Sequence, residues 1–176
     1  MRGSSINIQL ASRYSDFMMP LEGIRVLDLS RILAGPHAAQ SLSDLGADVI
    51  KVEAPWGDDS RTWGPPFQKG FDGAEVASYF LSCNRGKKIV FANLKNERER
   101  VRSLMDTVDV VIENFKPGAF DRLLGPVNAD LIVCSISGYG QEGPRRDEPA
   151  FDLTMQARSG IMSVSYTHLR AHETGC

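Results

Sequence analysis

The sequence is poor in cysteine and histidine, and it contains no long apolar run. Only three of its 176 residues are Cys and three are His. An odd, sparse set of cysteines does not form a disulfide framework, which favours a reducing compartment. No apolar run approaches the roughly 18–20 residues that span a bilayer, so we expect no transmembrane helix. There is no excess of positive charge either, because the net charge is −2, which argues against a general nucleic-acid binder.

What the sequence does contain is the composition of an ordinary globular protein. Hydrophobic residues make up 42% of the chain and charged residues 24%, with 16 Gly and 9 Pro. These proportions exclude a collagenous, coiled-coil or disordered chain. The length is that of about one domain, or of a large piece of a longer protein.

The first 18 residues differ in composition from the rest. They carry two Arg and four Ser, with no acidic residue before Asp16. This composition suits a mitochondrial transit peptide, and a translated extension ahead of a true start at Met19 explains it equally well. We therefore treat residues 1–18 as a transit peptide or an upstream extension, and expect the folded part to begin at residue 19.

The last 13 residues, VSYTHLRAHETGC, invite interpretation as a metal site. They contain the candidate ligands His168, His172, Glu173 and Cys176. However, Val164–Thr174 resembles the in-frame translation of a transposase-type sequencing adapter, and such segments are excluded from fold reasoning. We expect residues 164–176 to be non-native, the protein to have no metal site, and the natural sequence to continue differently after Ser163.

Between these ends, strand patterns alternate with helix patterns. Short runs rich in Val, Ile and Leu predict strands at 24–29, 49–52, 88–93, 108–113 and 131–136. Helical spacing or helix-forming composition predicts helices at about 36–45, 74–82, 97–107, 117–124 and from Asp152, which we expect to cap the last one. The alternation predicts an α/β fold with a Rossmann-like, doubly wound and mainly parallel sheet.

Ligands of such sheets bind beyond the carboxyl ends of the strands. The loops expected there carry cationic and amide side chains that suit a phosphorylated ligand, namely Arg31, Arg61, Lys95, Asn114 and Lys116. Lys51, Lys87 and Lys88 are expected to add charge near the same edge. A dinucleotide site is disfavoured, because the first turn, SRILAGP, has one glycine in place of G-x-G-x-x-G and Pro36 lacks an N–H.

Several long motifs resemble one family. LEGIRVLDLSRILAGPHAAQSLSDLGADVIKVEAP, DDSRTWGPPF, CNRGKK, VIENFKPGAFDRL, CSISGYGQEGP and FDLTMQARSGIMSV occur in the order found in class III CoA-transferases. The resemblance covers about residues 20–164. DDSRTWGPPF looks most like the succinyl-CoA:glutarate branch, which is mitochondrial in animals, so we expect a cytoplasmic or mitochondrial-matrix protein.

The resemblance implies an enzyme that moves CoA between carboxylic acids, from an acyl-CoA donor to a dicarboxylate-type acceptor. Family members are α/β proteins whose two chains interlock as a homodimer, and CoA is their cosubstrate, with no covalently bound cofactor. An aspartate attacks the thioester and becomes an aspartyl-CoA intermediate. That aspartate belongs to a motif downstream of FDLTMQARSG, so we assign no catalytic residue here, not even Asp152, and expect residues 19–163 alone to be inactive.

The same resemblance implies a set of CoA-binding positions. The motifs place Arg31, Leu33 and Ala34 at the thioester end, Lys51 at the end of the second strand, and Asn93 and Leu94 beside the adenine. They place the pantetheine and phosphate contacts at Asn114, Phe115 and Arg122. They place Gly138, Tyr139 and Gly140 in a glycine-rich loop near the active site.

Two further functions remain open at this point. An acyl-CoA racemase of the same family keeps its CoA and moves an α-proton with acid–base residues that lie mostly downstream. A non-catalytic module that binds CoA or a nucleotide needs no such residues. The arginines also have an ordinary alternative, because Arg31, Arg61 and Arg122 serve equally well in surface ion pairs.

Overall fold

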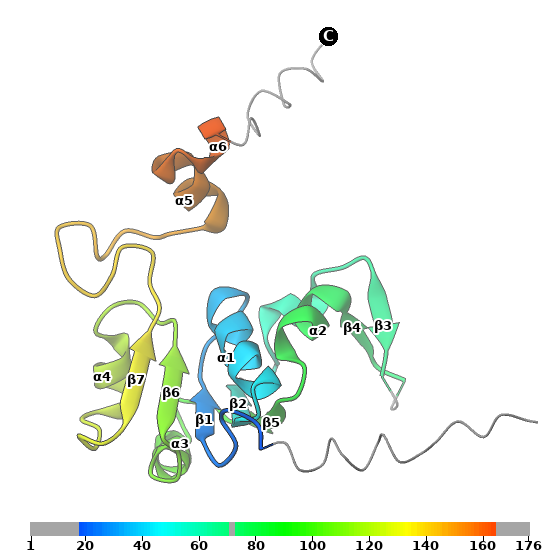
Figure 1. The fold of residues 1–176 in the computed structure, drawn as a ribbon, viewed down its shortest axis with the longest axis vertical. Coiled ribbons are helices and arrows are strands. Elements are labelled where there is room, and N and C mark those ends of the chain that lie inside the picture. Colours follow the sequence, from blue (N-terminus) through cyan, green and yellow to red (C-terminus); the bar gives the residue numbers. More distant parts are fainter. Residues whose placement is uncertain (1–17, 71–72, 165–176) are drawn as a thin grey trace, which may run out of the picture.

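The protein is an alternating α/β structure in the computed structural model, which describes residues 18–70 and 73–164 (Figure 1). The predicted N-terminal extension and the predicted non-native tail lie outside these ranges, apart from Met18 and Val164. None of the helices described is long and apolar enough to cross a membrane.

A parallel sheet of five strands forms the centre. Its strands are β1 (Arg25–Asp28), β2 (Asp48–Glu53), β5 (Lys88–Phe91), β6 (Val110–Glu113) and β7 (Ile132–Ser135). Their order is β5-β2-β1-β6-β7, and every neighbouring pair is parallel. The chain starts in the middle of the sheet with β1 and builds β2 and β5 on one side. It then crosses to the other side of β1 and builds β6 and β7, so the winding reverses between β1 and β6. This confirms the predicted Rossmann-like, doubly wound sheet.

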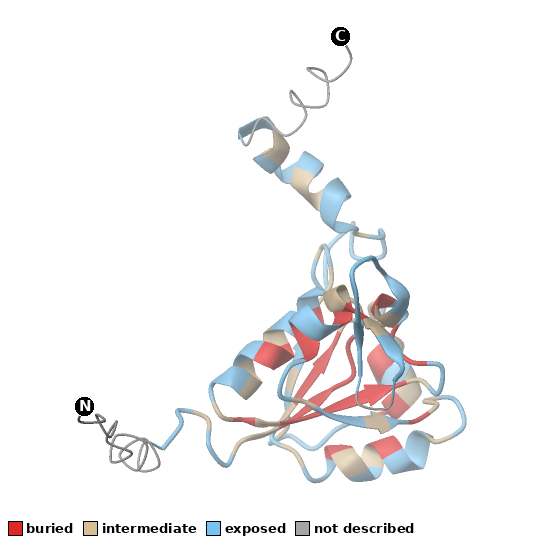
Figure 2. Cartoon of the chain, turned by 90° about the vertical axis from the view of Figure 1, so that its right-hand side faces the viewer, coloured by how far each residue is buried: buried red, intermediate tan, exposed pale blue. Residues whose placement is uncertain are grey.

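Helices cover both faces of the sheet (Figures 1 and 2). On one face, α1 (Ala34–Asp44) packs with Ala39 against Val26, Val49 and Ile112, and α2 (Ser78–Asn84) lies beside it. On the other face lie α3 (Arg98–Met105) and α4 (Ala119–Leu124). Between these helices and the sheet lies a core that contains Leu27, Ile50 and Val111 of the strands, Val101 of α3 and Leu124 of α4. Because the inner strands are buried on both sides, their sequences are nearly continuous apolar runs.

The segment between β2 and α2 differs from the prediction. The helix expected from Ala74 begins only at Ser78, because Glu75–Ala77 form a strand, β4, that pairs antiparallel with β3 (Phe67–Lys69). Ahead of this hairpin lies a short 3₁₀ helix, η2 (Asp59–Thr62). A hairpin this short gives no apolar alternation by which the sequence would reveal it.

The last helices, α5 (Asp152–Ser159) and α6 (Ile161–Val164), lie beyond the carboxyl ends of the strands and have no buried residue (Figure 1). The predicted capping role of Asp152 is wrong, because Phe151 occupies the N-cap position. Asp152 is the first helical residue, and its carboxylate accepts a 2.6 Å hydrogen bond from the Gln156 amide. An acidic side chain in the first turn is still favoured by the helix dipole.

Candidate functional site

The loops that follow the five parallel strands gather at one edge of the sheet, at the arrowheads in Figure 1. Ligands of doubly wound sheets bind at this edge, next to the strand pair where the winding reverses. Here that pair is β1 and β6, so the loops after Asp28 and Glu113 are the central candidates.

Asn114 joins these two loops through its side-chain amide. The Arg31 N–H donates to Asn114 Oδ1 over 2.9 Å, and Asn114 Nδ2 donates to the Arg31 carbonyl over 2.8 Å. Both ends of the amide are therefore occupied by backbone. The family motifs predict that both residues bind CoA. The structure brings them together, with Asn114 holding the loop that carries Arg31.

The rest of the loop after β1 is held by charged side chains. The Ser30 N–H donates to Asp28 Oδ1 (2.9 Å), and the Ser30 carbonyl accepts from Lys51 Nζ (2.8 Å). The Ile32 N–H donates to Asp58 Oδ2 over 3.2 Å. Together with the two bonds to Asn114, these satisfy every backbone N–H and C=O from the Ser30 N–H to the Ile32 N–H.

The charged groups behind the loop have no access to solvent. Burial by itself would raise the pKa of Asp58, but the side-chain and backbone hydrogen bonds of Ser60, the charge of Lys51 and the Ile32 N–H outweigh it. The pKa of Asp58 therefore lies below its ordinary value. Burial lowers the pKa of Lys87, which the neighbouring Asp28 carboxylate at 2.8 Å only partly offsets.

The N-terminus of α1 opens at the same edge. Leu33 is its N-cap residue and provides no side-chain cap, so the first N–H groups of the helix have no partner among residues 18–70 and 73–164. The exposed Leu33 and Ala34 thus present backbone donors and the positive end of a helix dipole. Gly35 is required behind them, because a Cβ there would overlap the side chain of Ser30.

Lys51 differs from the other predicted contacts. Its side chain is 0% exposed, and its ammonium is surrounded by Asp58 (3.2 Å), Asp28 (3.9 Å) and the Ser30 carbonyl (2.8 Å). A direct contact between Lys51 and a bound ligand is therefore not available in this structure. Strand alternation explains the position, because Lys51 lies on the sheet face that α1 covers.

The remaining predicted residues lie in the segments that follow β5 and β6. Asn93 forms a turn, accepting from the Lys95 N–H and donating from its own N–H to Glu97, while Leu94 and Phe115 pack partly against the core. Arg122, in the last turn of α4, is exposed and has no side-chain partner among the residues described. It is therefore free to bind an anion.

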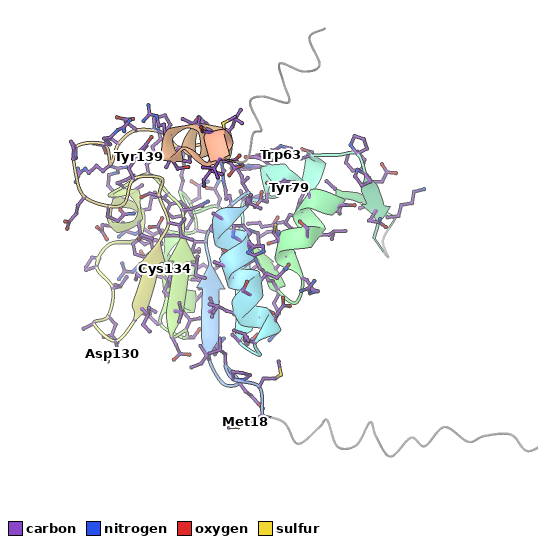
Figure 3. All side chains as sticks on the ribbon, turned by 45° about the horizontal axis from the view of Figure 1, so that its top comes forward. Met18, Trp63, Tyr79, Asp130, Cys134 and Tyr139 are labelled. Carbon is purple, nitrogen blue, oxygen red and sulfur yellow. The ribbon has the colours of Figure 1, made fainter. Side chains whose placement is uncertain are left out.

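Tyr139, in the glycine-rich loop after β7, lies beside α5 (Figure 3). Its hydroxyl accepts a hydrogen bond from Arg158, and the guanidinium of Arg145 lies 4.8 Å from its ring centre. Gly138 allows the loop to pass closely by Ala150, where a Cβ would overlap, and Gly140 has a φ of +82°. These contacts tie the predicted residues 138–140 to α5 and to the segment before it.

Metal binding finds no support in the part of the chain that is described. No group of three His, Cys, Asp or Glu side chains is arranged there to hold an ion. His168, His172, Glu173 and Cys176, which we expect to be non-native and not to bind a metal, lie outside the described residues. A pocket of about 250 Å³ does occur, but Asp109 and Asp130 line it, and these residues precede β6 and β7. Asp130 lies at the end of the sheet opposite the candidate site (Figure 3).

These observations agree with the comparisons with known proteins. The model of CoA-transferase family III matches residues 21–173. The chain belongs to this family. The match extends into residues 165–173, so the adapter interpretation of the tail stays a prediction.

Two curated relatives and one solved structure of the family illustrate the similarity. The chain is 49% identical over 156 residues to a succinate–glutarate CoA-transferase of Agrobacterium fabrum, covering 83% of this chain and 39% of that protein. It is 46% identical over 159 residues to the succinyl-CoA:glutarate CoA-transferase of Mus musculus, covering 85% and 35%. A CAIB/BAIF family protein from Brucella suis matches with a TM-score of 0.78 and 50% identity, covering 82% and 40%. The chain therefore spans well under half the length of these relatives.

In this family III chain, sequence analysis missed the acidic residues that hold the β1 loop. Asp28 and Asp58 were not singled out, although Asp28 interrupts the apolar run VLDL as Lys51 interrupts VIKV. Two opposite charges inside neighbouring apolar strands are a signal of a buried ion pair, since a lone buried charge is costly. Asp58 begins the motif DDSRTWGPPF and is the N-cap residue of η2, but nothing in the sequence places it beside Lys51.

Proposed function

We propose that this chain is the N-terminal, CoA-binding part of an enzyme that transfers CoA from an acyl-CoA to a dicarboxylate-type acid. The observation that carries the proposal lies where the winding of the sheet reverses, between β1 and β6. There hydrogen bonds hold the loop 30–34, and the N-terminus of α1 has no side-chain cap. Support comes from the 49% and 46% identity to two enzymes named for succinate and glutarate.

In this proposal CoA lies along the carboxyl edge. Arg31, Leu33 and Ala34 face the thioester end, where the free N–H groups of α1 favour negative charge. Arg122 binds a phosphate of the nucleotide, because its guanidinium is exposed and unpaired among the described side chains. Asn114 contributes by holding the loop, with both ends of its amide occupied.

The proposed chemistry is covalent and has two half-reactions. An aspartate carboxylate attacks the thioester carbonyl and expels CoA thiolate, which then attacks the aspartyl carbonyl of the mixed anhydride and releases the donor acid. The acceptor carboxylate then attacks the aspartyl-CoA carbonyl and expels CoA thiolate, which leaves a mixed anhydride of the aspartate and the acceptor. The thiolate attacks the acceptor's acyl carbonyl, which forms the product thioester and releases the free aspartate carboxylate. A carboxylate suits this role because it is ionised at neutral pH and its acyl adducts remain reactive.

We place the nucleophilic aspartate beyond residue 163. Asp28 and Asp58 are unsuited to this role, because their carboxylates are buried and bound to lysines. A longer protein is consistent with the comparisons, because the matches cover only 39% and 35% of the length of the two relatives. It also accounts for apolar side chains left exposed on β7 and around α5, at Ile132 (64%), Phe151 (71%) and Leu153 (66%). We propose that the remaining chain and an interlocked second copy cover them, and that residues 1–176 alone are inactive.

The test is an assay of the full-length protein with succinyl-CoA and glutarate. Mass spectrometry should detect glutaryl-CoA and succinate in equal amounts. Exchange of an α-proton of an acyl-CoA for deuterium without any acceptor acid would instead indicate a racemase. Binding of CoA without turnover of any acid would indicate a binding module, and either of these two results would contradict the proposal.

The binding site is tested separately with Arg122→Met. Loss of one charge-assisted phosphate contact should raise the KM for the acyl-CoA roughly tenfold, with a smaller effect at high salt. Arg85→Met is the matched control, because Arg85 is exposed and already paired with Asp44 at 2.6 Å. Equal effects of the two substitutions would contradict the proposed place of Arg122.

A further inference from the structure

Four charged side chains form a buried cluster beneath the β1 loop. They are Asp28, Lys51, Asp58 and Lys87, and none has a side chain more than 1% exposed. Two carboxylates and two ammonium groups balance one another. Burial of this many charges is costly even when they are paired, and apolar residues of similar volume are often as stabilising. The cluster therefore calls for a role beyond packing.

The sheet brings the cluster together. Asp28 and Lys51 are register partners on the neighbouring strands β1 and β2, and both lie on the face under α1. Lys51 Nζ lies 3.9 Å from Asp28 and 3.2 Å from Asp58. Lys87 Nζ donates to Asp28 (2.8 Å) and to the Pro36 carbonyl in the first turn of α1 (2.8 Å). The charges thus connect two strands, the loop before η2 and the start of α1.

Three members of the cluster also bind loop backbone that apolar side chains leave unsatisfied. Asp28 accepts from the Ser30 N–H, Lys51 donates to the Ser30 carbonyl, and Asp58 accepts from the Ile32 N–H. Asp58 is itself held by Ser60, whose N–H (3.0 Å) and hydroxyl (2.7 Å) donate to its Oδ1.

The loop needs such support because its backbone is strained. Ile32 has a φ of +73° and is the one residue other than glycine with a positive φ among those described. A β-branched side chain disfavours this left-handed conformation, and such residues persist only where their surroundings hold them. Ile32 lies directly before Leu33, the N-cap residue of α1.

We propose that Asp28, Lys51, Asp58 and Lys87 are positioning residues that hold the loop from Ser30 to Leu33 in its acyl-CoA-binding conformation. The inference rests on the proposed function. Lys51 acts through the loop and not by touching the ligand. Without the cluster, Ile32 relaxes to a negative φ, and the uncapped N–H groups of α1 no longer face the ligand together with Arg31.

The decisive variant is the double substitution Lys51→Met with Asp58→Ala in the full-length protein. The single Asp58→Ala leaves the buried Lys51 ammonium with Asp28, at 3.9 Å, as its nearest carboxylate and with the Ser30 carbonyl, so a large loss of Tm is expected. Removing both charges restores much of the Tm, yet the loop still lacks two of its hydrogen bonds. We expect a KM for acyl-CoA at least tenfold above wild type in the double variant, with a smaller change in kcat.

Amide hydrogen exchange separates a loop effect from a general loss of stability. In the double variant, peptides covering 29–34 should exchange faster, while peptides covering β6 keep their protection. Asp44→Ala is the control, because it breaks an exposed ion pair with Arg85 and should leave the KM and the exchange of 29–34 unchanged. Ser60→Ala is a milder variant that removes one 2.7 Å bond from Asp58 and should shift both readouts in the same direction.

Two results would overturn the proposal. One is a wild-type KM in the double variant or in Ser60→Ala, and the other is exchange that increases equally in 29–34 and in β6. Failure of the proposed function is distinguishable, because wild-type protein that binds no acyl-CoA removes the KM comparison. The exchange comparison then still decides whether the cluster holds the loop.

Discussion

The side chain of Asn114 pairs with the backbone of Arg31 as a neighbouring strand would. Two residues earlier, the Leu29 N–H donates to the Ile112 carbonyl over 2.8 Å, and the Asn114 amide continues this pairing with bonds of 2.9 and 2.8 Å. The loops after β1 and β6 are therefore joined where the winding of the sheet reverses. An amide is the side chain suited to this, because it both donates and accepts.

Asn114→Asp is predicted to weaken this connection. The carboxylate keeps an acceptor for the Arg31 N–H but places negative charge against the Arg31 carbonyl. Loss of one hydrogen bond and the new repulsion should lower the free energy of unfolding by about 1–2 kcal/mol in urea. Asn96→Asp is the control, since the side chain of Asn96 has no partner among the described residues. Equal effects of the two substitutions would show that Asn114 does not join the loops.

Arg61→Met should be far more destabilising than Arg85→Met. Arg61 forms two hydrogen bonds with Glu53, whose side chain is 1% exposed, and its guanidinium lies 3.8 Å from the ring centre of Phe80. Removing Arg61 leaves the buried Glu53 carboxylate with only the Asp58 N–H as a partner. This should lower the free energy of unfolding by roughly 2–3 kcal/mol.

Arg85 binds Asp44 in an exposed pair, so Arg85→Met should change stability by less than about 0.5 kcal/mol. Urea unfolding of both variants gives the comparison. A loss below 1 kcal/mol for Arg61→Met would mean that Glu53 is not held as the contacts imply.

Gly35→Ala should destabilise the protein although alanine favours helices. A Cβ at position 35 would overlap the side chain of Ser30. Because Ser30 is held by Asp28 and Lys51, it has little freedom to move away. Overpacking of this kind lowers the free energy of unfolding by about 1–3 kcal/mol. This exceeds the gain of about 1 kcal/mol from the higher helix propensity of alanine over glycine.

Thermal unfolding of Gly35→Ala and of the double variant with Ser30→Gly measures the effect. Removing the opposing side chain should relieve the overlap and recover part of the stability. A stabilised Gly35→Ala protein would contradict the close approach of residues 30 and 35.

The stability of the protein should fall in acid partly through Asp58. Its pKa is lowered in the folded state, so the folded protein binds this proton less tightly than the unfolded chain does. The contribution is complete above the ordinary Asp pKa of about 3.9 and is lost as the pH falls through the lower folded value. Urea unfolding should show that the free energy of unfolding falls less steeply between pH 5 and 2 for Asp58→Asn than for wild type. Parallel plots of this free energy against pH would disprove the lowered pKa of Asp58.

The sequence by itself determined the fold class, the family and most of the elements. Apolar runs of strand length, helical spacing and the punctuation by Pro36 and Gly46 follow from local backbone preferences, so they are visible without a structure. The resemblance also predicted Arg31 and Asn114 as binding residues, and the structure joins them by two hydrogen bonds. The β3–β4 hairpin escaped prediction, because strands this short carry too few residues to show a period. The start of α5 was predicted close to Asp152, but the N-cap residue is Phe151.

Only the tertiary structure decided what the polar residues of the strands do. Lys51 looks in the sequence like a cation available to a ligand, yet the register of β1 and β2 places it against Asp28 under α1. Asp58 is ten residues beyond the start of β2 and reaches the same point through an irregular loop. Burial and charge pairing depend on which segments meet in space. The sequence can therefore signal that Asp28 and Lys51 are buried, but it does not show that Asp58 and Lys87 complete the cluster. The strained backbone at Ile32 can therefore be recognised only in the folded protein.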